Sequence, residues 1–379
     1  MSRFLSVFVC VVLAASALSA RAVEPRQRPI VLAYVFPQAK VLQPGQIDGQ
    51  SLTRINYAFA NIADGRMVTG FVNDAANFAY LTGLRKTNPS LKVLVSVGGW
   101  EWSTNFSDVC FTESSRQRFI ESVTIFLRLY ELDGLDIDWE YPGMPGAGHP
   151  FRGEDKQNFT TLLKELRKRF DQESKTSGRT LYLTIAAGSS DEFIAHTEMD
   201  KVQKYVDTVN LMGYDFYEPD SDAITGNHAP LFADPADPKK ASDDASVRAF
   251  IKAGVPAEKI LLGVPFYGHV WGNVPGQNNG LFQPGKQIPN AYAPFSAIDS
   301  TMLNHGFLRF WDSMASVPYL YNPDKQIFVS YEDEQSLAAK GAYVLNHKLG
   351  GIMFWEYNGD PSGKLLGAIN YSLHASSPK

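Results

Sequence analysis

Cysteine is almost absent from this chain. Only Cys10 and Cys110 occur among the 379 residues, and Cys10 falls in an apolar N-terminal stretch. A small scaffold held together by disulfides is therefore excluded, and a full-sized hydrophobic core must stabilise the protein. No histidine motif accompanies Cys110, so we expect this residue to be a buried structural thiol rather than a nucleophile.

A large excess of one charge is also missing. The net charge is -5 and the acidic and basic residues are interspersed, so a nucleic-acid partner is not expected. The seven histidines are scattered singly, without the spacing of a metal-binding cluster. We therefore expect no metal site and no cofactor. There is no Ser/Thr-rich linker and no separate binding module.

Only one long hydrophobic run is present, Phe4–Leu18, and it is too short to span a bilayer comfortably. Arg3 precedes it, and the small residues Ala20 and Ala22 follow. This is the layout of a cleaved secretory signal. We predict that residues 1–22 are removed and that the mature chain is secreted or periplasmic, without a membrane contact. A buried N-terminal helix is the alternative, but the run lacks periodic polar positions.

Eight short runs of β-branched and aromatic residues alternate with amphipathic segments. The expected strands are Ile30–Val35, Ile55–Ala60, Lys92–Val97, Gly134–Trp139, Leu181–Ala187, Thr208–Met212, Ile260–Pro265 and Gly351–Trp355. The expected helices are Asn77–Lys86, Glu113–Tyr130, Gln157–Gln172, Asp200–Tyr205, Ala241–Ala253 and Tyr331–His347. This alternation predicts an α/β fold, a (β/α)8 barrel rather than an open sheet, over residues 23–379.

One long gap interrupts the alternation. The residues from Phe266 to about Tyr331 are rich in Gly, Pro, Asn and aromatics, and they are too many for a plain loop. We predict a small inserted subdomain at about residues 269–330, between strands 7 and 8.

The segment Asp133–Glu140 reads DGLDIDWE and is the strongest candidate for a catalytic site. Alternate residues of a strand share a face, so Asp136, Asp138 and Glu140 should line the barrel interior. Glu140 would lie at the C-terminal end of the strand, where barrel active sites open. Buried like charges retain protons, and glycosidic cleavage requires an acid and an anionic stabiliser. We therefore expect a polysaccharide-cleaving enzyme with Glu140 as its general acid.

A metal site and a structural acidic patch are the alternatives for this segment. Metal sites usually take ligands from several elements, and no histidine cluster accompanies these carboxylates. The interleaved Leu, Ile and Trp argue against a solvated run of charges. Both alternatives are therefore less favoured than catalysis.

The motif D-G-x-D-x-D-x-E at the end of a strand resembles the signature of family 18 glycoside hydrolases, the chitinases. The resemblance extends over about residues 29–371. Its other motifs are Lys92–Trp100 (KVLVSVGGW), Leu211–Asp215 (LMGYD) and Gly350–Trp355 (GGIMFW). The long gap after Gly263–Gly268 (GVPFYG) falls where many members carry an insertion. The resemblance thus implies a TIM barrel with a small α+β insertion domain.

The resemblance also implies residue roles. Glu140 would protonate the glycosidic oxygen, while the N-acetyl oxygen of the substrate acts as nucleophile. Asp138 would hold the oxazolinium ion, Asp136 would hold the proton that lets Asp138 turn, and Tyr214 would align the acetamido oxygen. The implied substrate-binding residues are Tyr34, Phe59, Ser96, Gly99, Trp100, Tyr141, Met212, Asp215 and Trp355. Further candidate sugar platforms, for which packing is an equal alternative, are Trp102, Phe216, Tyr217 and Trp271.

The implied function is that of a secreted, monomeric chitinase acting on chitin or chito-oligosaccharides. Two residues depart from the family pattern, His269 where many relatives have Arg and Asn358 where many have Asp. An endo-β-N-acetylglucosaminidase acting on N-glycans or peptidoglycan has the same chemistry and stays open. A non-catalytic chitin-binding lectin is disfavoured because Glu140, Asp138 and Tyr214 are all retained.

Overall fold

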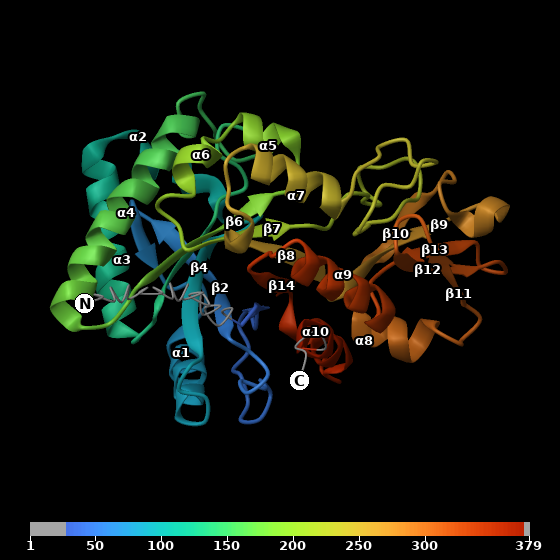
Figure 1. Cartoon of the computed structure of the whole chain (residues 1–379), viewed down its shortest axis with the longest axis horizontal. Coiled ribbons are helices and arrows are strands. Elements are labelled where there is room, and N and C mark those ends of the chain that lie inside the picture. The colour runs from blue at the N-terminus through green and yellow to red at the C-terminus, as the bar shows by residue number, and fades with distance from the viewer. Residues whose placement is uncertain (1–27, 375–379) are drawn as a thin grey trace, which may run out of the picture.

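A computed structural model describes residues 28–374 of the chain. Eight parallel strands close a barrel in the order β1-β14-β8-β7-β6-β5-β4-β2, and β1 pairs with β2 to complete it (Figure 1). The barrel strands are β1 Ile30–Val35, β2 Arg54–Ala63, β4 Lys92–Gly98, β5 Gly134–Asp138, β6 Tyr182–Gly188, β7 Thr208–Met212, β8 Ile260–Pro265 and β14 Gly351–Trp355. The predicted (β/α)8 barrel is therefore confirmed. The predicted signal peptide lies outside the described residues.

Helices surround the barrel, and each of the expected ones is present with shifted ends. They are α1 Asp74–Gly83, α2 Phe106–Phe111, α3 Glu113–Leu129, α4 Asp155–Ser177, α5 Asp191–Ala195, α6 Met199–Val202, α7 Asp243–Lys252, α9 Glu334–Asn346 and α10 Lys364–His374. The sequence did not predict α2, α5 or α10. Capping boxes fix two of the helix starts, formed by Thr112 and Ser115 on α3 and by Asp333 and Ser336 on α9.

The long gap after β8 contains a second, antiparallel sheet with strand order β10-β9-β13-β12-β11. Its strands are β9 Tyr267–Gly272, β10 Lys286–Pro294, β11 Leu308–Asp312, β12 Val317–Asn322 and β13 Ile327–Ser330, and the short helix α8 Phe295–Ala297 follows β10. The sheet lies to one side of the barrel, beyond α9 (Figure 1). Tyr217 and Trp271 are fully buried in its core, so neither is a sugar platform.

The side chains along β5 alternate between two faces of the strand, as the sequence predicts. Leu135, Ile137 and Trp139 pack in the main core between the strands and the helices, whereas Asp136 and Asp138 belong to the opposite face. Cys110 is a fully buried free thiol, as expected. A short strand, β3 Arg66–Val68, extends the sheet antiparallel to β2.

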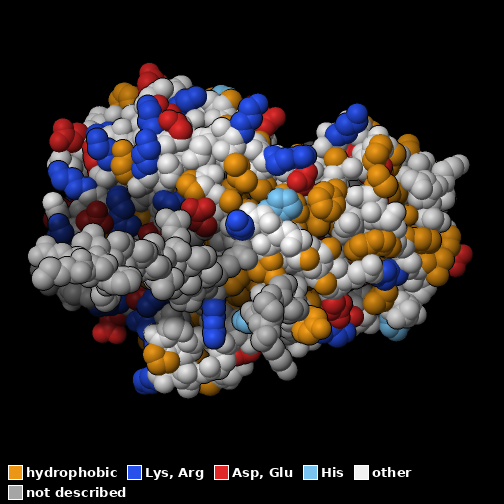
Figure 2. All heavy atoms as spheres, viewed as in Figure 1, with side chains coloured by type: hydrophobic (Ala, Val, Ile, Leu, Met, Phe, Trp, Pro, Cys, Tyr) orange, Lys and Arg blue, Asp and Glu red, His pale blue; other side chains and the backbone are white. Residues whose placement is uncertain are grey.

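The surface differs between the two parts of the chain. Charged side chains of both signs are interspersed over the barrel, whereas hydrophobic side chains are more frequent over the inserted sheet (Figure 2). Among residues 28–374, no helix combines the length and apolar character needed to cross a membrane.

Candidate active site

A cleft of about 1730 Å³ opens at the C-terminal ends of the barrel strands. The residues singled out from the sequence that line it are Tyr34, Phe59, Trp100, Trp102, Asp138, Glu140, Tyr141, Met212, Tyr214, Asp215, Phe216 and Trp355. The inserted sheet contributes Tyr267, His269 and Tyr292 to the wall. The remaining expected residues, Asp136, Ser96 and Gly99, lie beneath this lining.

Asp136, Asp138 and Glu140 form a row of carboxyls that begins in β5 and ends just after it. Asp136 lies at the bottom of this row and is fully buried. Its partners in the strand register are Ser96 on β4 and Thr184 on β6. The hydroxyls of Tyr34 and Ser96 each donate to Oδ2 at 2.8 Å, while Thr184 and Asn210 donate to Oδ1 at 2.5 and 3.0 Å. Burial raises the pKa of this carboxyl, and the donated hydrogen bonds oppose the rise. Three of these four partners are hydroxyls, which can both donate and accept, so the contacts satisfy the carboxyl in either protonation state.

Asp138 has a different environment one step up the strand. Its register partner on β4 is Gly98, which has no side chain to donate a hydrogen bond. Within residues 28–374, no group bonds to its buried Oδ1. Burial, and then the charges of Glu140 and Asp136, raise the pKa of Asp138 well above its usual range. Burial thus raises the pKa of both aspartates, and the hydrogen bonds that oppose the rise at Asp136 have no counterpart at Oδ1 of Asp138.

Glu140 lies at the top of the row, half-buried in the mouth of the cleft. Burial raises its pKa to about 7, the hydrogen bond with Tyr141 opposes this, and the charges of Asp215 and Glu218 add to it. The backbone N–H of Glu140 donates to Oγ of Ser103 at 2.9 Å, which fixes the end of the strand. A carboxyl with this pKa can hold a proton at neutral pH and still release it, as general acid–base catalysis requires.

Aromatic side chains form the floor of the cleft beside these acids. Trp355 stacks on Phe59 with ring centroids 5.5 Å apart and planes at 21°. Gly99 lies directly under Phe59 at a φ of +79°, and an added Cβ would be 2.6 Å from that ring. At the rim, the exposed Trp100 faces Tyr141 at 6.5 Å. Flat apolar faces with a few convergent polar groups are typical of a site for a small organic ligand such as a sugar.

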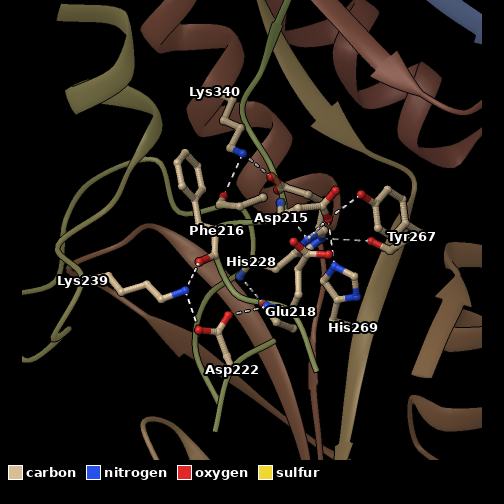
Figure 3. A network of polar contacts seen from close by, with 12 residues as sticks. Asp215, Phe216, Glu218, Asp222, His228, Lys239, Tyr267, His269 and Lys340 are labelled. Atoms are coloured by element: carbon tan, nitrogen blue, oxygen red, sulfur yellow. Dashed lines mark hydrogen bonds and ion pairs between the residues drawn. The ribbon is translucent and has the colours of Figure 1, made fainter. Parts of the chain in front are cut away.

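Asp215 is the centre of a polar cluster that the sequence did not predict (Figure 3). Its Oδ1 accepts a hydrogen bond from the Tyr267 hydroxyl at 2.6 Å and lies 2.8 Å from Nε2 of His269 and 3.3 Å from Nδ1 of His228. Burial by itself opposes ionisation of Asp215, but the contacts with His228 and His269 hold its pKa well below the usual range. Burial lowers the pKa of His228 to about 4. The histidines are scattered in the sequence, yet the fold brings two of them to one carboxylate.

Sequence reasoning also missed Thr184, Ser103 and Glu218. Thr184 lies on the inward face of β6, a strand that the sequence predicted. The alternation of side chains within one strand does not reveal, however, that Thr184 lies level with Asp136 on the neighbouring strand. Ser103 follows β4 in a loop and had no motif to mark it. Glu218 lines the cleft, and burial and then the charge of Asp215 raise its pKa to about 7.

The model of glycosyl hydrolases family 18 matches residues 30–360. The chain belongs to this family. Chitinase A1 of Niallia circulans is 36% identical, with 86% of this chain and 55% of that relative aligned. Chitotriosidase-1 of Mus musculus is 34% identical, over 82% of this chain and 68% of that one. A solved family 18 N-acetylglucosaminidase from Paenibacillus barengoltzii is 39% identical with a TM-score of 0.83, over 91% and 99% of the two chains. The family 18 chain thus spans about half the length of chitinase A1.

Proposed function

We propose that this protein is a secreted chitinase that hydrolyses β-1,4 bonds between N-acetylglucosamine units. The observation that carries the proposal is the row of Asp136, Asp138 and Glu140, which rises from the barrel interior into a cleft with an aromatic floor. Family membership and relatives named as chitinases support the same substrate class.

The reaction begins with proton transfer from Glu140 to the glycosidic oxygen. Family 18 is a recognised exception to the two-carboxylate scheme, so the nucleophile is the N-acetyl oxygen of the sugar itself. Asp138 binds the acetamido N–H and stabilises the cyclic oxazolinium ion, while the Tyr214 hydroxyl aligns the acetamido oxygen. Water then opens the ring with Glu140 as base, and the anomeric configuration is retained. The pKa of Glu140, about 7, suits both of its roles.

Two matched substrates test this chemistry. We expect the purified protein to cleave a chitin hexamer and to release products whose new end is initially the β-anomer, as followed by NMR. A fully deacetylated hexamer of the same length has no N-acetyl oxygen and should not be cleaved. Cleavage of both hexamers at similar rates would rule out the substrate-assisted mechanism.

The endo-β-N-acetylglucosaminidase alternative uses the same acid and the same nucleophile. Parallel assays on N-glycans and on peptidoglycan separate the two substrate classes. Faster release from either of these than from the chitin hexamer would replace chitin as the proposed substrate.

Secretion is a separate part of the proposal and rests on residues 1–22. Expression of the full chain in a bacterial host should yield an exported protein that begins close after Ala22. N-terminal sequencing of the exported and the cell-associated protein checks this, and an uncleaved chain retained in the cytoplasm would contradict it.

A further inference from the structure

Three potential metal-ligating atoms converge in the wall of the cleft. They are Oδ1 of Asp215, Nδ1 of His228 and Nε2 of His269, and all lie within 4.8 Å of one another. The two nitrogens are 3.3 and 2.8 Å from the carboxylate oxygen, and both imidazoles are directed towards it (Figure 3). With bonds of about 2.0–2.2 Å to a tetrahedral zinc ion, neighbouring donor atoms lie about 3.3–3.5 Å apart. The His228–Asp215 pair at 3.3 Å already has this separation, whereas the His269–Asp215 pair at 2.8 Å is at hydrogen-bond distance and has to widen by about 0.5 Å to admit an ion.

The contacts of His228 provide a second, independent indication of a cation. Its side chain is fully buried, and each ring nitrogen faces an acceptor at 3.3 Å: Nε2 faces the carbonyl oxygen of Tyr267, and Nδ1 faces Oδ1 of Asp215. A neutral imidazole has only one N–H, so one of these two contacts places a lone pair against a lone pair. The backbone N–H of Asp215 also reaches Nδ1, but at a long 3.4 Å. A positive charge between Nδ1 and Asp215 satisfies both contacts.

That positive charge is either a proton or a metal ion. The His228 side chain is fully buried, and taking the charge of a doubly protonated imidazolium out of water is costly. When the neutral ring donates Nε2–H to the Tyr267 carbonyl, Nδ1 presents its lone pair to the carboxylate. Metal-ligating histidines are oriented in this way, with the second nitrogen bonded to a backbone carbonyl or a carboxylate.

We propose that Asp215, His228 and His269 bind a divalent transition-metal ion, of which zinc is the representative. Two imidazoles and a carboxylate suit zinc or copper, whereas calcium and magnesium prefer oxygen ligands alone. Asp215 and His269 line the cleft, so the ion reaches the site from solvent and keeps a fourth position open towards the cleft.

The surrounding charges permit a cation at this place. Lys340 lies behind His228, but its ammonium group is paired with the buried carboxylates of Asp243, at 2.8 Å, and Glu332. On the cleft side, the carboxyl of Glu218 interacts with both Asp215 and His269. The positive charge of Lys340 is therefore compensated, and the open side of the site carries negative charge.

The site has a consequence for activity that rests on the proposed function. The charge of Asp215 acts on Glu140, so the two groups share one part of the cleft. A bound ion would withdraw Asp215 from sugar contacts and occupy space beside the acid. Zinc should therefore inhibit hydrolysis of the chitin hexamer, and a chelator should restore it.

Isothermal titration of the full chain with zinc chloride, without substrate, tests the site. We expect one ion per chain, and at least about tenfold weaker binding in His269→Ala, which removes a ligand, and in Asp215→Asn, which replaces a carboxylate ligand by a neutral amide. His305→Ala is the matched control, since this histidine is exposed in the inserted subdomain. A second readout is the visible spectrum of bound Co²⁺, whose intense tetrahedral bands should be present in the parent protein and absent from His269→Ala. Thermal unfolding confirms that each variant is folded.

Three results would overturn the proposal: no binding to the parent chain, unchanged binding in His269→Ala, or equal loss of binding in His305→Ala. The last result would mean that zinc binds only surface histidines. In the hydrolysis assay, the rate of each variant with zinc is compared with its own rate without metal. The rate of His269→Ala should not change when zinc is added. A chain that binds one zinc ion through these residues but hydrolyses no chitin supports the metal site and contradicts the proposed function, so the two failures are distinguishable.

Discussion

Replacing Glu140 by glutamine should abolish activity and stabilise the fold at the same time. The pKa of this carboxyl rises from its ordinary 4.5 to about 7 in the folded protein, chiefly through burial. Ionising it is therefore harder in the folded state than in the unfolded state. At about 1.4 kcal/mol per pH unit, the difference costs the folded protein about 3 kcal/mol at neutral pH. Glutamine keeps the shape and does not ionise, so Glu140→Gln should recover most of this free energy.

The sign of the effect fixes its pH dependence. Below pH 4.5 the carboxyl is protonated in both the folded and the unfolded states, and the substitution changes little. As the pH rises from 4.5 to 7, only the unfolded state loses its proton, and the stability gained by the variant grows. We expect a gain of about 1 kcal/mol at pH 5 and about 3 kcal/mol at pH 8.

Urea unfolding of the parent protein and Glu140→Gln at pH 5 and pH 8 measures the gain. Glu121→Gln is the matched control, because Glu121 is exposed on α3 and its loss removes a carboxylate that is not buried. Hydrolysis of the chitin hexamer by Glu140→Gln should fall by at least about 100-fold, which is the lower range of a general acid's contribution.

Two outcomes would refute this reasoning. A stability difference that does not increase between pH 5 and pH 8, or that matches the Glu121→Gln control, would mean that Glu140 is not a buried acid with a raised pKa. Activity retained within a few-fold would mean that another group donates the proton.

Two further substitutions test the buried polar groups around the site. Thr184→Val keeps the side-chain shape but removes a donor to the buried Asp136, and it should lower the free energy of unfolding by about 1.5–3 kcal/mol in urea titrations; no loss would mean that this hydrogen bond is not formed. Lys340→Met leaves the carboxyls of Asp243 and Glu332 buried without their cation and should cost about 3–5 kcal/mol. Because both carboxyls have raised pKa values, the loss should be larger at pH 8 than at pH 5, and a loss independent of pH would contradict the charged triad.

The barrel could be predicted because its strands are short, apolar and regularly spaced. Four of the eight expected strands, including Thr208–Met212 and Ile260–Pro265, match the observed bounds, and the others differ at their ends. The helix α2 escaped prediction because Phe106–Phe111 is too short to show a helical period. The helix α10 was also missed, although its apolar face packs into the main core.

The candidate site was only partly predictable. Asp136 and Asp138 could be placed on one face from the sequence, because the alternation of side chains is a property of a single strand. The cluster at Asp215 depends on the fold, since His228 comes from a loop after β7 and His269 from the inserted sheet. No local spacing could reveal that these residues meet, which is why the sequence predicted no metal site.

The different surroundings of Asp136 and Asp138 follow from the strands that neighbour β5 rather than from β5 itself. The three carboxyls have nearly the same intrinsic pKa. The register places the hydroxyls of Ser96 and Thr184 beside Asp136, but it places Gly98, which offers no donor, beside Asp138. Hydrogen bonds therefore oppose the rise in pKa that burial gives Asp136, whereas the pKa of Asp138 is raised well above its usual range by burial and by the charges of Glu140 and Asp136. Gly98 cannot be replaced by a larger donor, because a Cβ there would lie 2.2 Å from the backbone oxygen of Asp138. The close approach of two backbones thus leaves Oδ1 of Asp138 without a fixed partner, so that this oxygen can accept the N–H of a substrate amide.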